Sequence, residues 1–247
     1  MSAATGNKGG CDGNLEALTL LPAFADFPHG ALLAVGSGSR PNRRRGVLLG
    51  LDMRGAVNSS PRSVDLSPVL VPLAEEFAEV NIEGAVVAGD GLRLFQRGNK
   101  QHADNAIIRF PLAPVLDALK TGRADSIRPS AIDRFDLGLI EGIPLCFTDA
   151  AALPGGDMVF SAIAEDTLNA FDDGPCVGAA IGIADKDGRL RFLRRLDRPA
   201  KVEGVHARLN GDDLELLLVT DADDAAVPAL LYSATIAGFA SQCAERF

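Results

Sequence analysis

Tryptophan is absent from the 247-residue chain and tyrosine occurs once, so a core must be built from aliphatic side chains and 12 phenylalanines. Apolar residues make up 47% of the sequence, which is enough for a sizeable core. No stretch reaches the roughly 18 apolar residues that a membrane helix requires, and the N-terminal residues lack the pattern of a signal peptide. We therefore expect a cytoplasmic protein that has no membrane partner.

Basic residues are also scarce. Lysine and arginine number 24 against 33 acidic residues, which gives a formal charge of −9. Nucleic acids and anionic membranes attract basic surfaces, so this balance argues against a nucleic-acid partner and favours cations or neutral small molecules. The one basic concentration, Arg40 with Arg43, Arg44 and Arg45, lies in an expected loop. That loop is either simply solvated or grips a carboxylate or phosphate.

Signatures of specific chemistry are missing as well. The cysteines at 11, 146, 176 and 243 form no C-x-x-C pair and lie far apart, so we expect reduced thiols and no zinc ribbon. There is no G-x-S-x-G motif, the glycine-rich stretches do not have nucleotide-binding spacings, and none of the three histidines is placed as a general base. The motifs therefore name no reaction.

The sequence does contain one pattern that occurs four times. An acidic residue follows a polar–apolar pair, and small or apolar residues, a turn and a second apolar strand come after it. The copies lie about 50 to 70 residues apart, somewhat more than the 40 to 50 of common propeller repeats. Their acidic residues are Glu16, Glu83, Asp149 and Glu203.

Two further strands fit between successive copies, which makes four strands per repeat, as in a propeller blade. These further strands are expected at 45–53, 64–73, 105–112, 132–140, 175–185 and 189–197. Helix should be limited to short stretches near 72–79 and 114–122. The sequence thus predicts an all-β protein, a β-propeller of four-stranded antiparallel blades, with a flexible leader at 1–13 and a single domain at 14–247.

The fourth copy lacks a full set of strands. It has a third strand at 228–236 and then stops, and no outer strand is evident before the first copy. Two alternatives remain open: a four-blade ring that lacks one outer strand, or a propeller whose opening blade is missing from the chain.

The repeat also predicts a site. First strands of propeller blades line the central channel, so the four acidic residues should converge there. Clustered carboxylates repel one another and suit Ca²⁺ or Mg²⁺ better than Zn²⁺. Alternatively, they hydrogen-bond to neighbouring blades, or Arg97 and Lys201 neutralise them. Ligand-binding residues are expected at the same end of the channel, namely Ser37, Arg97, Asn99, Glu165, Asp166, Lys201 and Asp221.

Several segments resemble a known group of propellers. NIEGAVV at 81–87 and KVEGVHA at 201–207, with FTDAAALPGGDMVF at 147–160, resemble blade openings of phytase-like (esterase-like phytase) propellers. They are more distantly similar to gluconolactonase and strictosidine-synthase-like propellers. The similarity is closest to an uncharacterised bacterial propeller family and covers 14–230, although members of that family usually carry another blade before LEALTLLP.

The resemblance implies a divalent cation, Ca²⁺ or another, held by Glu16, Glu83, Asp149 and Glu203. It also implies metal-dependent hydrolysis of an ester, lactone or phosphoester. The alternative is a non-catalytic propeller that binds a small ligand or a protein partner, and a purely structural remnant is a third reading.

Overall fold

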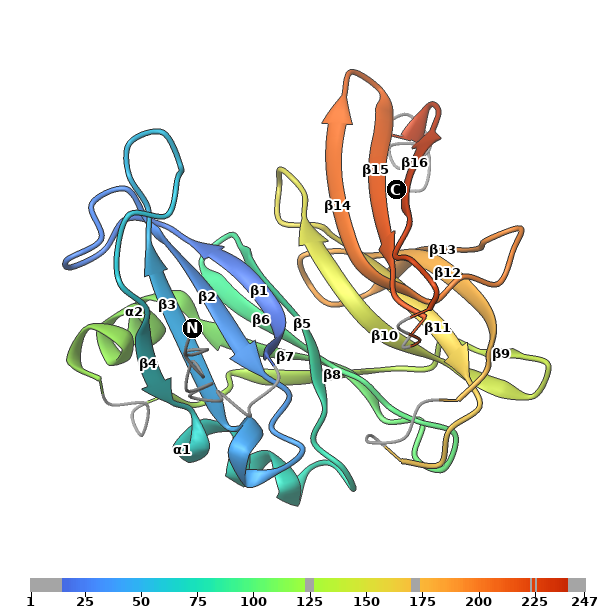
Figure 1. Cartoon of the computed structure of the whole chain (residues 1–247), viewed down its shortest axis with the longest axis horizontal. Helices are drawn as coiled ribbons and strands as arrows, with labels where there is room; N and C mark the ends of the chain where they lie inside the picture. Colours follow the sequence, from blue (N-terminus) through green and yellow to red (C-terminus); the bar gives the residue numbers. More distant parts are fainter. Residues whose placement is uncertain (1–14, 123–126, 170–173, 223, 225, 240–247) are drawn as a thin grey trace, which may run out of the picture.

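Four antiparallel sheets follow one another along the chain in the computed structural model (Figure 1). The structure describes residues 15–122, 127–169, 174–222, 224 and 226–239. The predicted leader at 1–13, with Cys11, and the C-terminal Cys243 lie outside these residues. Among the described residues no helix is long and apolar enough to cross a membrane.

Each sheet is one blade, and the strands within a blade pair in chain order. Blade 1 comprises β1 (Leu15–Leu21), β2 (Ala31–Gly36), β3 (Arg45–Gly50) and β4 (Arg62–Asp65). Blade 2 comprises β5 (Ile82–Ala88), β6 (Gly91–Gln96), β7 (Asn105–Pro111) and β8 (Ala131–Phe135). Blade 3 comprises β9 (Leu139–Ile140), β10 (Ile143–Ala152), β11 (Met158–Glu165), β12 (Cys176–Ala184) and β13 (Leu190–Arg195). Blade 4 comprises β14 (Val202–Asn210), β15 (Asp213–Thr220) and β16 (Leu231–Ile236).

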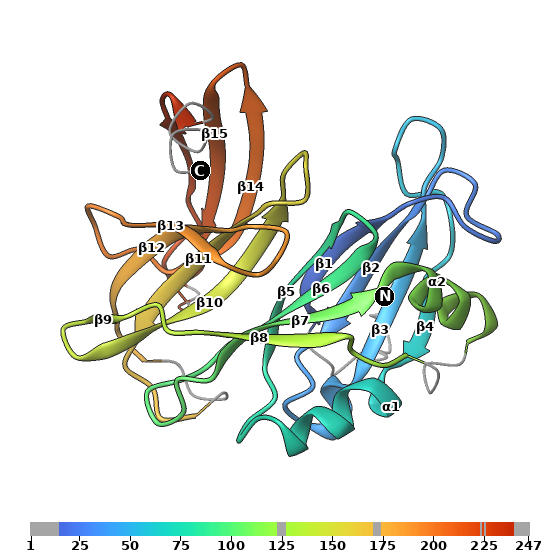
Figure 2. The ribbon, with the colours of Figure 1, turned by 180° about the vertical axis from the view of Figure 1, so that it is seen from behind.

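This arrangement confirms the predicted all-β propeller. The first strands β1, β5, β10 and β14 lie innermost, and hydrogen bonds join successive blades near them (Figures 1 and 2). The Ile82 N–H donates to the Ser37 carbonyl between blades 1 and 2, and the Asn105 side chain donates to the Leu145 carbonyl between blades 2 and 3. Thr148 Oγ1 donates to the Val202 carbonyl between blades 3 and 4.

Two of the predicted strands are wrong in part. The segment 64–73 leaves the sheet after β4 and forms α1 (Ser67–Leu70) and the 3₁₀ helix η2 (Val71–Glu75). Pro68 and Pro72 lie in this segment, and proline cannot donate a hydrogen bond to a strand ladder. The segment 132–140 is divided, because β8 ends at Phe135 and β9 pairs with β10 in the next blade.

The predicted helix near 114–122 is confirmed as α2 (Leu112–Thr121), and η2 covers part of the other predicted helical stretch. Val115, Ala118 and Leu119 share one face of α2 at i, i+3 and i+4 spacing, and all three are buried. Gly122 follows the helix with φ of 72°, a left-handed conformation that ends helices and favours glycine. A second short 3₁₀ helix, η1 (Pro41–Arg43), lies in the arginine-rich loop.

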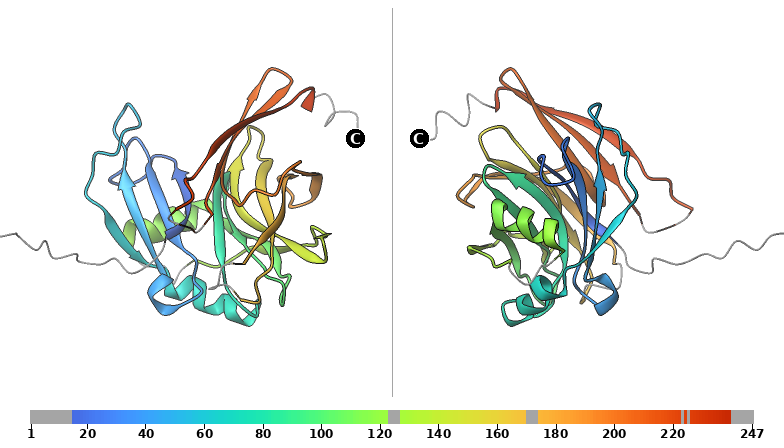
Figure 3. Two further views of the ribbon diagram at one scale, coloured as in Figure 1. Left: turned by 45° about the vertical axis from the view of Figure 1, so that its right-hand side comes forward. Right: turned by 90° about the vertical axis from the view of Figure 1, so that its left-hand side faces the viewer.

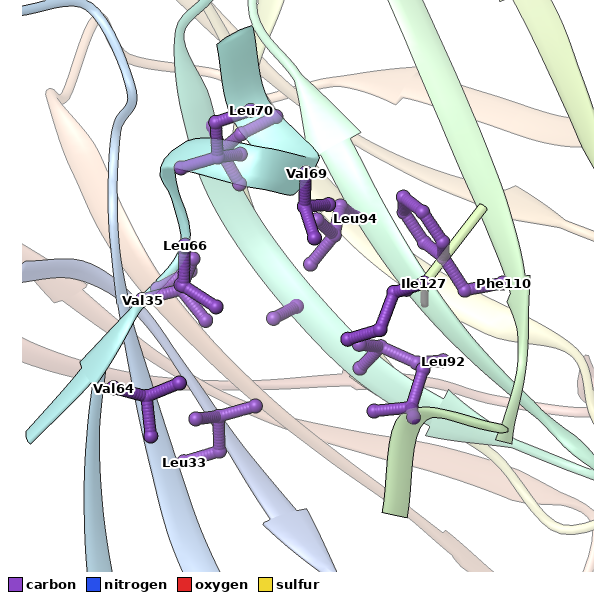
Figure 4. Packing of buried hydrophobic residues seen from close by; sticks show 14 of the residues in the cluster. Leu33, Val35, Val64, Leu66, Val69, Leu70, Leu92, Leu94, Phe110 and Ile127 are labelled. Atoms are coloured by element: carbon purple, nitrogen blue, oxygen red, sulfur yellow. The ribbon is translucent and has the colours of Figure 1, made fainter. Parts of the chain in front are cut away.

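Hydrophobic clusters fill three interfaces between blades. The first lies between blades 1 and 2 and includes α1 and α2, so that Leu33, Leu66, Leu94 and Phe110 face a common core (Figure 4). The second joins blades 2 and 3 around Phe147, and the third joins blades 3 and 4. Burial of these aliphatic and phenylalanine side chains is the main driving force for the assembly of the blades.

The fourth interface of the ring is open. In the described part of the chain no buried cluster joins blade 4 to blade 1, and the two blades splay apart (Figures 1 and 3). Leu18 and Leu20 on blade 1 are 55% and 57% exposed, and Leu217 and Val219 on blade 4 are each 43% exposed. Apolar side chains on these two blades thus remain accessible to solvent.

Candidate functional site

Each innermost strand carries a register shift, at the second residue of β1, β5 and β14 and at the sixth residue of β10. One extra residue stands between neighbouring pairs of the ladder, and these residues are Glu16, Glu83, Thr148 and Glu203. A bulge of this kind leaves the extra residue unpaired and re-aims its side chain. The repeat pattern therefore identified three of the four equivalent positions correctly.

The prediction was wrong for the third repeat. Thr148 occupies the position equivalent to Glu16, Glu83 and Glu203, and Asp149 comes one residue later. The apolar residue before the bulge gives the right register: Leu15, Ile82, Phe147 and Val202 each precede the extra residue. The acidic residue of the third copy, Asp149, is therefore one residue out of register with the acidic residues of the other three copies. A one-residue shift matters, because alternate residues of a strand point to opposite faces.

Five charged side chains meet at the end of the channel where the innermost strands begin, and we call them the central cluster: Glu83, Arg97, Glu165, Lys201 and Glu203. Arg97 Nη2 forms a close ion pair with Glu165 Oε2, and Arg97 Nη1 lies 3.7 Å from Glu83 Oε1. Lys201 Nζ lies 3.0 Å from Glu165 Oε1 and 3.9 Å from Glu203 Oε1. The two cations thus bridge three carboxylates from blades 2, 3 and 4.

The strand ends explain why these residues meet. Arg97 directly follows β6, and its N–H donates to the Asn81 carbonyl, just before β5. Glu165 is the last residue of β11, and Lys201 directly precedes β14. In antiparallel hairpins the second strand returns to the end where the first strand begins. The end of β6 therefore lies beside the bulge at Glu83, and the end of β11 lies beside the start of β10, beyond the pair formed by Leu145 and Ala164.

The electrostatics of the cluster shift the protonation of Glu83 and Glu203 into the neutral pH range. Burial raises the pKa of Glu83 to about 7, although Arg97 opposes this change. Burial also raises the pKa of Glu203 to about 8, again against the attraction of Arg97. Burial alone would lower the pKa of Arg97, but the carboxylates of Glu83, Glu203 and Glu165 outweigh it and hold the guanidinium charged. Two carboxyls that exchange protons near neutral pH therefore lie beside permanent positive charge.

The hydrogen bonds of these two glutamates differ. Asn81 Nδ2 donates to Glu83 Oε1 at 2.7 Å, which fixes the orientation of that carboxyl. Glu203 Oε1 is buried and has no hydrogen-bond partner among the described residues, while the Glu203 side chain as a whole is 24% exposed. A buried polar atom without a partner costs free energy, so Glu203 has unused capacity to bind a ligand.

Thr148 and Asp149 join blades 3 and 4. Among the described residues, neither forms a hydrogen bond with a side chain of the central cluster. Thr148 Oγ1 bonds to the Val202 carbonyl at 2.6 Å and to Ser161 Oγ at 2.8 Å. Asp149 Oδ2 accepts the Val205 N–H at 2.8 Å, and burial raises the pKa of Asp149 to about 6. The sequence allows two roles for Asp149, a metal ligand or a hydrogen bond to the neighbouring blade. The contact with Val205 is the second of these.

The remaining predicted residues lie around the cluster and serve local contacts. Glu16 Oε1 lies 3.6 Å from Arg43 Nη1, so the arginine-rich loop reaches the first bulge. Ser37 Oγ is bonded to Ser39 Oγ, and Asp166 pairs with Lys100 at 2.6 Å. Asn99 Oδ1 accepts the N–H groups of Gln101 and His102 and so holds the loop after β6, while the Asp221 N–H donates to the Lys201 carbonyl.

The described residues do not fit a divalent cation in this arrangement. No group of three His, Cys, Asp or Glu side chains in the described part of the chain is placed to hold a metal ion. The positive charge that the carboxylates attract is supplied by Arg97 and Lys201. Calcium binding stays a prediction from the sequence. It would require the metal ion to displace the side chains of Arg97 and Lys201 from the carboxylates.

A hollow of about 620 Å³ lies farther along the channel and is lined by the later residues of all four innermost strands. Its lining includes Leu18–Pro22 of blade 1 and its following turn, Ala85–Val87 of blade 2, Ala150–Ala152 of blade 3 and Val205–Ala207 of blade 4. Apart from Thr19, His29 and His206, every lining side chain is apolar.

The sequence matches the model of a family of unknown function (DUF6910) over residues 13–225, so the chain belongs to that family. No curated protein matches the sequence. Among solved structures, a subtype N10 neuraminidase-like protein of A/little yellow-shouldered bat/Guatemala/060/2010 is 8% identical, with a TM-score of 0.39. This match covers 87% of the present chain and 57% of the neuraminidase-like protein.

The periplasmic gluconolactonase PpgL of Pseudomonas aeruginosa is 14% identical, with a TM-score of 0.38. That match covers 91% of this chain and 72% of the gluconolactonase.

Proposed function

We propose that this member of a family of unknown function is a hydrolase that cleaves an ester, lactone or phosphoester at the central cluster. One observation carries the proposal: Glu83 and Glu203, with pKa values of about 7 and about 8, lie beside Arg97 and Lys201 at one end of the channel. General acid–base catalysis is most efficient when the catalytic pKa is close to the working pH.

The contacts of the two glutamates give them different roles. Asn81 Nδ2 donates to Glu83 Oε1, and Arg97 Nη1 lies 3.7 Å from the same oxygen, so Glu83 is the better stabilised as a carboxylate and accepts a proton from the attacking water. Glu203 Oε1 has no hydrogen-bond partner among the described residues, and the protonated Glu203 donates its proton to the leaving oxygen. The water oxygen bonds to the carbonyl carbon or to phosphorus, the bond to the leaving oxygen breaks, and exchange with solvent resets both carboxyls.

Arg97 and Lys201 stabilise the negative charge that develops on the substrate. Glu165 balances one of these two cations, so the three side chains together retain one positive charge. This charge is held in a largely buried site, where electrostatic stabilisation of a transition state is stronger than in water. Glu203, whose side chain is 24% exposed against 13% for Glu83, is the more accessible of the two carboxyls.

Substrate screening with matched variants tests the proposal. The purified protein is assayed against panels of carboxylic esters, lactones and phosphoesters, and the first active substrate is used for Glu83→Gln and Glu203→Gln. Each variant should lower kcat/KM by about 10²- to 10⁴-fold, the usual contribution of a general acid or base. Glu215→Gln, at an exposed ion pair in blade 4, is the control and should retain full activity. Equal activity in all three variants would contradict the proposal.

Non-catalytic binding of a small ligand is the second candidate function. The hollow favours it, because its volume of about 620 Å³ lies within the range typical of small-molecule sites. A ligand that binds without turnover and depends on the same glutamates would support this candidate over hydrolysis.

A further inference from the structure

The central cluster and the hollow belong to the same strands. Ala85 follows Glu83 by two residues in β5, and Val205 follows Glu203 by two residues in β14. Two residues of a strand advance by about 7 Å, so the apolar lining begins roughly one side chain beyond the two carboxyls. A molecule that reaches the cluster from the channel can therefore also occupy the hollow.

The hollow is suited to hydrocarbon. Three successive residues of β5, β10 and β14 border it, and three residues span about 10 Å of strand. On the blade 1 side it is bordered by Leu18 and Leu20, whose side chains are more than half exposed. Covering these leucines would remove apolar surface from water, which favours binding. The hollow's polar side chains are Thr19, His29 and His206, and no lysine, arginine or carboxylate is among the described residues of its lining.

The charges at the other end bear on the head group. Arg97 and Lys201 are balanced by Glu165 and by Glu83 in its ionised form, so these four side chains have no net positive charge with which to attract an anionic phosphoester. Within the three substrate types of the proposed function, a neutral carboxylic ester or lactone therefore fits better, and its hydrolysis releases a carboxylate that can pair with Arg97 or Lys201.

From this continuity we propose that the hollow binds the hydrocarbon chain of the substrate, and that the substrate is a medium-chain carboxylic ester or lactone. The inference rests on the proposed function for the reaction, but the binding of the chain is independent of turnover. The acyl part occupies the hollow between blades 1, 2, 3 and 4, and the scissile bond lies beside Glu83 and Glu203.

Calorimetric titration with fatty acids of six to twelve carbons tests the binding directly, since these acids resemble the reaction product. We expect binding that strengthens with chain length up to the capacity of the hollow. Leu20→Asp should weaken it at least tenfold, because it places a charge in the apolar lining. Leu139→Asp is the matched control: Leu139 is 55% exposed on the short edge strand β9 and does not line the hollow, so this variant should bind like the original protein.

The outcomes separate the two proposals. No binding of any of these acids, or equal weakening by Leu20→Asp and Leu139→Asp, would overturn the assignment of the hollow. Binding that depends on Leu20 supports the hollow even if no ester is cleaved, and in that case the hydrolase proposal alone fails. Conversely, turnover of acetate esters or small lactones with no gain from longer acyl chains would support the hydrolase and overturn the hydrocarbon site.

Discussion

Gly84 and Gly204 occupy the same place in their blades, directly after a bulged glutamate, but their surroundings differ. A Cβ at Gly84 would lie 3.2 Å from the Ala150 nitrogen and 3.3 Å from the Asp149 carbonyl carbon, both in the backbone of the neighbouring blade. A Cβ at Gly204 would meet Val219 at 3.5 Å, an ordinary contact. The same E-G motif therefore has a packing role in blade 2 that it lacks in blade 4.

We expect Gly84→Ala to destabilise the protein by about 1 to 3 kcal/mol, because backbone cannot move aside as a flexible side chain can. Gly204→Ala should change the free energy of unfolding by less than about 0.5 kcal/mol. Urea unfolding followed by circular dichroism measures both variants. Similar stability of the two would show that blades 2 and 3 can move apart without cost.

Individual glutamates also determine how activity depends on pH. In the proposed reaction Glu83 must be ionised and Glu203 protonated, so kcat/KM should be highest between about pH 7 and about pH 8 and fall on both sides. Glu83→Gln should remove the acidic limb and Glu203→Gln the alkaline limb from whatever activity remains. A profile that is flat from pH 5 to pH 9 would exclude these two groups as the catalytic pair.

At the scale of elements, β10 connects blades 2 and 3 through one buried aromatic residue. Phe147 in this strand contacts Phe95 of β6, Phe135 of β8 and Phe160 of β11, with ring centroids 4.8 to 5.6 Å apart and edge-to-face geometry. It is fully buried and directly precedes the bulge at Thr148. The packing of one aromatic ring thus fixes the start of β10 against blade 2.

Phe147→Ala should cost about 3 to 5 kcal/mol of unfolding free energy, as expected for removing a phenylalanine from a well-packed core. Thermal and urea unfolding measure the loss. Phe24→Ala is a suitable comparison, because Phe24 lies in the turn after β1, is only partly buried and contacts only one other ring, Phe27. An equal cost for both changes would show that the cluster around Phe147 contributes little beyond local burial.

At the scale of the whole molecule, buried carboxyls make stability depend on pH. The folded protein raises the pKa of Glu83 and Glu203 from 4.5, and that of Asp149 from 3.8, so it binds these protons more tightly than the unfolded chain does. The stabilisation is fully present at low pH, below the unfolded pKa values, and is lost as pH rises through about 6 to about 8.

The Tm should therefore fall between about pH 5 and pH 9, in a direction opposite to ordinary acid denaturation. A variant with both Glu83→Gln and Glu203→Gln should show a flatter profile, because glutamine mimics the protonated carboxyl at every pH. Scanning calorimetry across this range gives the test. An unchanged slope in the double variant would mean that these glutamates do not carry the pH dependence.

Calcium is also a question for the whole assembly, since the sequence predicts a cation held by residues of four blades. With Arg97 and Lys201 already paired to the carboxylates, we expect no rise in Tm when chelator-treated protein receives Ca²⁺ up to about 1 mM, the weak end of protein calcium sites. A rise of several degrees would establish the sequence prediction and require these cations to be displaced.

The sequence by itself determined the all-β class, the four repeats and three of the four bulged positions. Strand periodicity, glycine turns and the repeated acidic residue involve residues close together in the chain, so they can be recognised without knowing the fold. It also placed Arg97, Glu165 and Lys201 at the same end of the channel, because hairpin geometry follows from strand order.

Only the tertiary structure decided which charges meet, that Thr148 and not Asp149 holds the fourth position, and that the ring is open between blades 4 and 1. The ion pairs of Arg97 and Lys201 with Glu165 join residues 68 and 36 positions apart, and they depend on how the blades pack. The raised pKa values of Glu83 and Glu203 likewise come from burial by neighbouring blades, a property that no single repeat possesses.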